Sequence, residues 1–139
     1  MSTGWTGDLR TGLETVDRQH REYFRRVDRL LAAYADENRP AVVSETLRFL
    51  VGYVDHHFKT EERMMTQAAY PGLEAHAERH AWFRAELRAL QPRATGDAGG
   101  VVRLNALLID WFQNHIRRVD TKMTTFLLVR AQAARTGVN

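Results

Sequence analysis

The sequence predicts an all-α protein, an up-down-up-down antiparallel four-helix bundle that forms a single domain over 1–139. Apolar residues recur three and four positions apart in four long segments, as they do on one face of a helix. Proline, glycine and asparagine separate these segments, and no segment shows the alternation typical of a strand. With 139 residues, 44% of them hydrophobic, the chain is long enough to bury one apolar core.

The first two helices are expected on either side of a short polar break. The first is expected at about 12–37, where Thr11 and Glu14 have the spacing of a capping box. The second is expected at about 40–68, with Pro40 near its first position, where a missing N–H costs nothing. A connection this short predicts that the two helices are antiparallel neighbours.

Proline and glycine also mark the limits of the other two helices. The third helix is expected at about 71–91, after a turn that contains Pro71 and before Pro92. The fourth is expected at about 100–134, after a glycine-rich stretch. Each connection is again short or moderate, so the up-down order continues to the end of the chain.

The composition argues against several classes of function. The chain has no cysteine, so any metal must be bound by nitrogen and oxygen atoms. The net charge is only +3 and the arginines are spread between acidic residues, so we expect no nucleic-acid binding. No apolar run approaches the ~18 residues of a membrane span, and no targeting segment is evident. We therefore expect a cytoplasmic monomer without membrane insertion.

Histidines and carboxylates replace apolar residues on the inner faces of these helices. His57 and Glu61 are four residues apart, as are His76 and His80. Residues four apart lie one turn apart on the same face of a helix. Each pair can therefore present two ligand atoms to one point.

The positions of the histidines also match the breaks between helices. The midpoint of His20 and His57 falls in the first break, that of His57 and His80 in the second, and that of His80 and His115 in the third. Residues equally far from a turn lie at the same height in antiparallel helices, because each helix rises about 1.5 Å per residue. The sequence therefore predicts a metal site at one level in the core of the bundle.

Asp120 does not fit a regular helix. It follows His115 by five residues, a step that turns about 140° on an α-helix, whereas a four-residue step turns about 40°. We therefore expect a π-bulge or local unwinding near 117–119, an insertion that is frequent at functional sites.

These residues belong to four motifs, namely Asp17-Arg-Gln-His20, His57-Phe-Lys-Thr-Glu61-Glu62-Arg-Met64, Tyr70-Pro71 before His76-xxx-His80-xx-Phe83, and Trp111-xxx-His115-Ile116-xxx-Asp120. Together they cover nearly the whole chain. In this pattern the sequence resembles the bacterial hemerythrins, single-domain non-haem di-iron proteins that bind oxygen.

The resemblance implies a metal site of seven residues, His20, His57, Glu61, His76, His80, His115 and Asp120. It places two iron ions (Fe²⁺/Fe³⁺) in the core. The three histidines after Glu61 would hold one iron and the two before it the other. Both carboxylates and an oxo or hydroxo group would bridge the ions. With six positions on each ion, one position stays open on the iron with two histidines, where O₂ would bind as ligand.

We therefore expect reversible O₂ binding for oxygen storage, transport or delivery, and no enzymatic activity. The partner would be O₂ and an unidentified protein that receives oxygen or a signal. Two alternatives remain, namely O₂ or redox sensing through a partner protein, and turnover of peroxide or nitric oxide or storage of iron. Iron is favoured over zinc, since bridging carboxylates suit a six-coordinate pair better than a closed tetrahedral site.

Three polar residues near the motifs have less definite places. We expect His56 at the surface or beside the ligands, Glu62 in solvent, and Tyr23 as a possible hydrogen-bond donor near the site. The apolar residues expected in the core around the ligands are Phe58, Trp82, Phe83, Trp111 and Ile116.

Overall fold

A computed structural model describes residues 4–35, 40–96 and 98–137 of the chain. Its helical elements in order are η1 Gly7–Leu9, α1 Glu14–Ala35, α2 Pro40–Gln67, α3 Leu73–Leu90, η2 Gln91–Arg93, α4 Ala98–Asn105, η3 Ala106–Trp111, α5 Phe112–His115, η4 Ile116–Asp120 and α6 Thr121–Thr136. The segments η3 and η4 are π-helical, so α4 to α6 form one continuous helical run.

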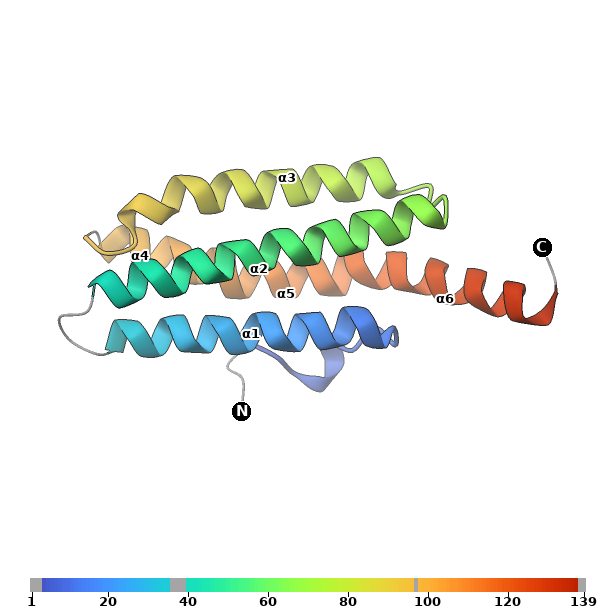
Figure 1. The fold of residues 1–139 in the computed structure, drawn as a ribbon, viewed down its shortest axis with the longest axis horizontal. Coiled ribbons are helices and arrows are strands. Elements are labelled where there is room, and N and C mark those ends of the chain that lie inside the picture. Colours follow the sequence, from blue (N-terminus) through green and yellow to red (C-terminus); the bar gives the residue numbers. More distant parts are fainter. Residues whose placement is uncertain (1–3, 36–39, 97, 138–139) are drawn as a thin grey trace.

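The helices form the predicted four-helix bundle. Helices α1, α2, α3 and the run from α4 to α6 lie lengthwise beside one another and alternate in direction (Figure 1). Helix α1 packs on α2, α2 on α3, and α3 on α4. The described parts of the chain contain no strand, and none of their helices is long and apolar enough to cross a membrane.

The helix limits differ from the predicted ones by a few residues. The expected end of the first helix, at about position 37, falls outside the described residues, which stop at Ala35 before resuming at Pro40. Helix α3 begins and ends slightly inside the predicted 71–91, and the last helical run begins at Ala98 instead of about Gly100. Such shifts are common at helix ends, where the hydrogen-bond ladder frays.

The predicted capping box at Thr11 and Glu14 is wrong. Helix α1 begins at Glu14, so Thr11 lies too far ahead of it to cap its first N–H groups. The carboxylate of Asp17 instead accepts hydrogen bonds from Thr11 N–H (2.8 Å), Thr11 O–H (2.7 Å) and Gly12 N–H (3.1 Å). Asp17 is 1% exposed, so this buried carboxylate fixes how the chain enters the bundle.

The apolar core lies in two parts along the bundle. The larger cluster has twenty buried residues, among them Phe24, Phe58, Phe83 and Phe112. The smaller cluster consists of Val16, Met65 and Met123 with partly buried neighbours. Each of these three lies about one turn from a histidine or carboxylate of the seven-residue set. The polar set therefore sits between the two apolar clusters.

Tyr23 stabilises the π-helical segment η3. A π-turn shifts backbone hydrogen bonds from the regular α-helical ladder, which leaves a carbonyl available for another donor. The buried Tyr23 hydroxyl donates to the carbonyl oxygen of Leu108 at 2.6 Å. Its ring stacks on Phe112 with centroids 3.7 Å apart. The hydroxyl of Tyr23, which was expected to donate a hydrogen bond near the ligands, thus donates to the backbone instead.

Replacing Tyr23 with phenylalanine should lower the free energy of unfolding by about 1 to 3 kcal/mol, since the buried Leu108 carbonyl loses its donor. Urea unfolding followed by circular dichroism measures the change. Tyr53→Phe is the matched control, because the described structure gives the half-buried Tyr53 hydroxyl no hydrogen bond. Equal losses in the two variants would contradict this role for Tyr23.

Candidate metal centre

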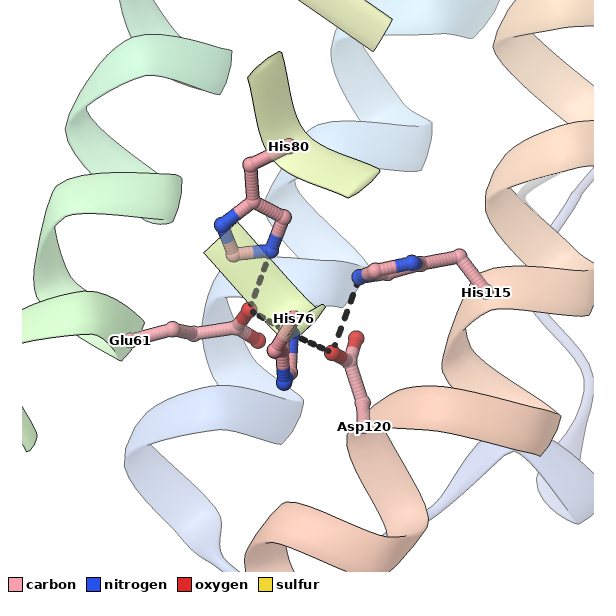
Figure 2. A group of neighbouring side chains, drawn as sticks. All are labelled: Glu61, His76, His80, His115 and Asp120. Atoms are coloured by element: carbon pink, nitrogen blue, oxygen red, sulfur yellow. Dashed lines mark ion pairs between the residues drawn. The ribbon is translucent and has the colours of Figure 1, made fainter. Parts of the chain in front are cut away.

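The structure brings all seven predicted ligand residues together. His20 comes from α1, His57 and Glu61 from α2, and the others from α3, α5 and η4. Every one of the seven residues is buried, with exposed fractions from 0% to 4%. Figure 2 shows five of them, Glu61, His76, His80, His115 and Asp120, pointing toward one another from three directions.

The Asp120 carboxylate reaches this cluster because the helix locally widens. Residues Ile116–Asp120 form the π-helical segment η4, in which the N–H of Thr121 bonds to the carbonyl of Ile116 five residues earlier. A π-turn holds more residues than an α-turn, so the five-residue step from His115 returns to the same face. The insertion expected near 117–119 is confirmed.

Glu61 divides its two oxygens between two groups of histidines. Its Oε1 lies 3.1 Å from Nε2 of His80 and 3.4 Å from Nε2 of His76. Its Oε2 lies 3.1 Å from Nε2 of His57 and 3.5 Å from Nε2 of His20. One carboxylate therefore faces two separate imidazole groups.

Asp120 repeats this division. Its Oδ1 lies 3.0 Å from Nε2 of His76 and 3.1 Å from Nε2 of His115, while its Oδ2 lies 3.1 Å from Nε2 of His20. The donors thus form two sets that each fit around one cation, Glu61, His76, His80, His115 and Asp120 in one and His20, His57, Glu61 and Asp120 in the other. Both sets contain the same two carboxylates.

Many polar atoms of this cluster have no hydrogen-bond partner. Within the described chain, these buried atoms include Nε2 of all five histidines and both oxygens of Glu61 and of Asp120. Buried polar atoms are ordinarily hydrogen-bonded, because an unmet one costs about 1 to 3 kcal/mol. Here imidazole nitrogens and carboxylate oxygens face one another without hydrogen bonds. Both are atom types that bind metal ions as ligands.

The electrostatics keep the two carboxylates ionised. Burial disfavours their charged form, but the surrounding imidazoles outweigh it and hold the pKa of Glu61 and of Asp120 well below the usual range. Burial likewise opposes a charged imidazolium, yet the Asp120 and Glu61 carboxylates raise the pKa of His20 and of His76 to about 9. A bound cation would displace these protons.

Two of the imidazoles are held in place by side chains outside the cluster. Nδ1 of His57 lies 2.7 Å from Oε1 of Gln19, and Nδ1 of His80 lies 2.7 Å from Oε2 of Glu62. Such contacts fix the ring orientation, so that Nε2 is the nitrogen directed at a metal. Gln19 was missed in the sequence, although it continues the apolar line from Val16 to Tyr23 on the inner face of α1.

The expectation that Glu62 lies in solvent is wrong. Its side chain is only 28% exposed, and it contacts Arg84 (Oε2–Nη1 3.5 Å) as well as His80. The hydrogen bond from His80 holds the pKa of Glu62 below its usual value. The Glu62 side chain is long enough to reach a neighbouring helix although its Cα lies off the inner face of α2. His56, in contrast, is exposed, as expected.

Replacing Glu62 with alanine should weaken metal binding by about 10- to 100-fold, the usual cost of removing a carboxylate that orients a ligand histidine. Anaerobic competition with a ferrous chelator measures the affinity. Glu45→Ala is the control, because Glu45 is exposed on the same helix. If both variants bound metal as tightly as the wild-type chain, the Glu62–His80 contact would have no role in the site.

Aromatic rings enclose the cluster. Phe58 stacks on His80 with centroids 3.8 Å apart, and Trp111 stacks on His115 at 4.7 Å. Phe112, which was not singled out in the sequence, packs near both His20 (6.0 Å) and His57 (6.1 Å).

The expected positions of the surrounding apolar residues are only partly right. Phe58, Phe83 and Ile116 are fully buried. Trp82 is 50% exposed instead of buried, and Trp111 is only partly buried. Phe112 takes the inner position next to Trp111, because the π-turn of η3 shifts the phase of the helix.

Comparison with known proteins agrees with this arrangement. Residues 11–127 match the family model described as Hemerythrin HHE cation binding domain. The chain is 32% identical over 116 residues to a bacteriohemerythrin of Stenotrophomonas maltophilia, covering 84% of this chain and 75% of the relative. It is 32% identical over 132 residues to a bacteriohemerythrin of Ralstonia nicotianae, covering 94% and 93%. It is also 30% identical over 118 residues to a myohemerythrin of Riftia pachyptila, covering 85% and 88%.

Proposed function

Because this chain belongs to the hemerythrin family, we propose that its buried cluster holds two iron ions and binds O₂ reversibly, as a carrier or store and not as an enzyme. The observation that carries the proposal is the division of each carboxylate between two groups of histidines. A carboxylate whose two oxygens face two ligand sets suits a bridge between two cations. A site for a single ion gives no reason for this division.

The two ligand sets would hold the ions unequally. His76, His80 and His115 would bind one ion, His20 and His57 the other, and Glu61 and Asp120 would bridge them. Two six-coordinate ions that also share one solvent-derived bridge have a single open position, and it falls to the ion with fewer histidines. The open position would therefore lie beside His20 and His57.

The donor set favours iron and reversible chemistry. Imidazole suits iron, and bridging carboxylates suit six-coordinate ions better than tetrahedral zinc. The di-iron sites of ferritin-like bundles instead rely on glutamates with Glu-x-x-His motifs. Five neutral imidazoles add no compensating negative charge, so they favour the ferrous state. In that state the iron pair would supply the electrons for reversible O₂ binding.

The surroundings of His20 and His57 also suit a carrier. Phe112 is fully buried against both rings, and Tyr23 stacks behind it. An apolar wall keeps water and protons away from the open position, which slows irreversible oxidation. The Tyr23 hydroxyl is occupied by Leu108, so it is not free to deliver a proton.

The test is metal analysis combined with anaerobic reduction and re-aeration. We expect two irons per chain and a visible absorption change that appears with O₂ and reverses when O₂ is removed. A colourless chain that holds zinc, or no metal, would overturn the proposal. Rapid turnover of peroxide or nitric oxide with a reductant would replace carriage with catalysis.

A further inference from the structure

A separate pocket lies behind His115, on the outer side of the metal centre. It has a volume of about 300 Å³. The residues that line it are Arg79, Trp111, Asn114, His115, Arg118 and Val119. Arg79 comes from α3 and the others from the α4 to α6 run, so the pocket lies at the seam between two helices.

The pocket has a positive wall without a counter-charge. Arg79 and Arg118 are exposed, and within the described residues neither guanidinium forms an ion pair or hydrogen bond. No carboxylate lines the pocket. Some other arginines at the bundle surface do have acidic partners, for example Arg84 with Asp55 and Arg117 with Asp8. The two positive guanidinium groups of this pocket repel each other, and an anion bound between them would attract both.

His115 adds a buried polar group to the same wall. Its side chain is 2% exposed, and its Nδ1 has no hydrogen-bond partner among the described residues. In His57 and His80 the corresponding Nδ1 is held by Gln19 and Glu62, whereas Nδ1 of His20 and of His76 also has no partner within the described chain. Of the three histidines with an unpartnered Nδ1, His115 is the one that lines the pocket. When Nε2 binds a metal, Nδ1 carries a proton and needs an acceptor. The pocket is where His115 could find one.

We propose that this pocket binds a small oxyanion between Arg79 and Arg118, and that the anion accepts the Nδ1 proton of His115. Arginine forks recognise phosphate and carboxylate oxygens, and Asn114 offers a further donor. The volume fits a ligand at the small end of the usual range.

The anion would act on the metal centre through His115. A negative acceptor on Nδ1 raises the basicity of the imidazole, so that it becomes a stronger ligand. This regulatory role, unlike the binding itself, rests on the proposed iron site. The pocket is not the expected O₂ entrance, because His115 belongs to the ligand set with three histidines and the open position lies on the other ion.

Calorimetric titration of the iron-loaded chain with inorganic phosphate, at constant ionic strength, tests the binding. We expect one phosphate per chain, and about tenfold or greater weakening in Arg79→Gln and in Arg118→Gln, since each loses charge-assisted hydrogen bonds. Arg29→Gln, which changes an exposed arginine of α1, should bind as the wild-type chain does. Absence of binding, or equal affinity in all variants, would overturn the proposal. Equal affinity is also the result expected if phosphate binds directly to iron.

Two further measurements identify the anion and the link to His115. Acetate in place of phosphate distinguishes a carboxylate ligand from a phosphate ligand, while chloride competing equally with both would indicate charge screening and contradict a built site. Phosphate should shift the visible absorption of the iron-loaded chain, and an Arg79→Gln/Arg118→Gln double variant should lose that shift. An unchanged wild-type spectrum despite binding would refute the link through His115. If the chain holds no iron, the proposed function fails, and the same titration of the metal-free chain still tests whether the pocket binds phosphate.

Discussion

A chain with His57 replaced by alanine is expected to lose the paired metal site. His57 is one of only two histidines in its ligand set, and its Nε2 lies 3.1 Å from Oε2 of Glu61. Without it, His20 is the only imidazole left to hold that ion. Iron content should fall below two per chain, and the reversible absorption change with O₂ should disappear. Metal analysis and anaerobic spectroscopy measure both effects.

The adjacent histidine provides the matched control. His56 is exposed, whereas His57 is fully buried, although the two residues are neighbours on α2. His56→Ala should keep two irons and the full response to O₂. Because His57→Ala also opens a cavity, circular dichroism must show that the variant is still helical. A folded His57→Ala chain that retains two irons would show that the ligand set is wrongly assigned.

The level of the site could be predicted because antiparallel helices share one geometric rule. Equal distances from a turn mean equal heights, so positions in the sequence alone placed His57 opposite His80 and His80 opposite His115. Both of these turns are at least partly described. The break predicted between His20 and His57 falls outside the described residues, yet the two rings lie 4.7 Å apart.

In the π-helical segments, the α-helical periodicity of apolar residues no longer predicts which side chains face the core. The segment η4 could be predicted because it lies between two residues that must share a face, His115 and Asp120. The segment η3 was not predicted, since its residues are apolar and fit a regular helix equally well. Because the prediction assumed a regular helix here, it placed Trp111 in the core and did not identify Phe112 as the buried residue.

The contacts of Gln19 and Glu62 could not be predicted for a different reason. Each depends on the distance between two helices and on the rotamer of a long side chain. The angle around one helix gives neither quantity. A residue about 100° away from the inner face, like Glu62, can lie in solvent or reach a neighbouring helix, and only the packed structure distinguishes these cases.

Removing iron is expected to lower the melting temperature by roughly 10 to 20 °C, because a metal bound only by the folded chain stabilises it by about 4 kcal/mol at a thousandfold excess over Kd. Thermal unfolding followed by circular dichroism, before and after anaerobic chelation, measures the shift. The same chelation of His57→Ala, which has already lost the iron pair, should change its melting much less. Superimposable melting curves for the wild-type chain would show that the buried cluster needs no metal.

The loss of stability on removal of iron should also be uneven along the bundle. Among the described residues, the small apolar cluster of Val16, Met65 and Met123 with its partly buried neighbours lies on one side of the metal centre, whereas the cluster of twenty buried residues lies on the other. Without metal, the unmet imidazoles and carboxylates separate the small cluster from the large one. Amide hydrogen exchange should therefore accelerate most around Met65 and Met123, and least around Leu47 and Leu104. Uniform acceleration would mean that the bundle opens as one unit, so the metal would stabilise the whole fold and not specifically its smaller end.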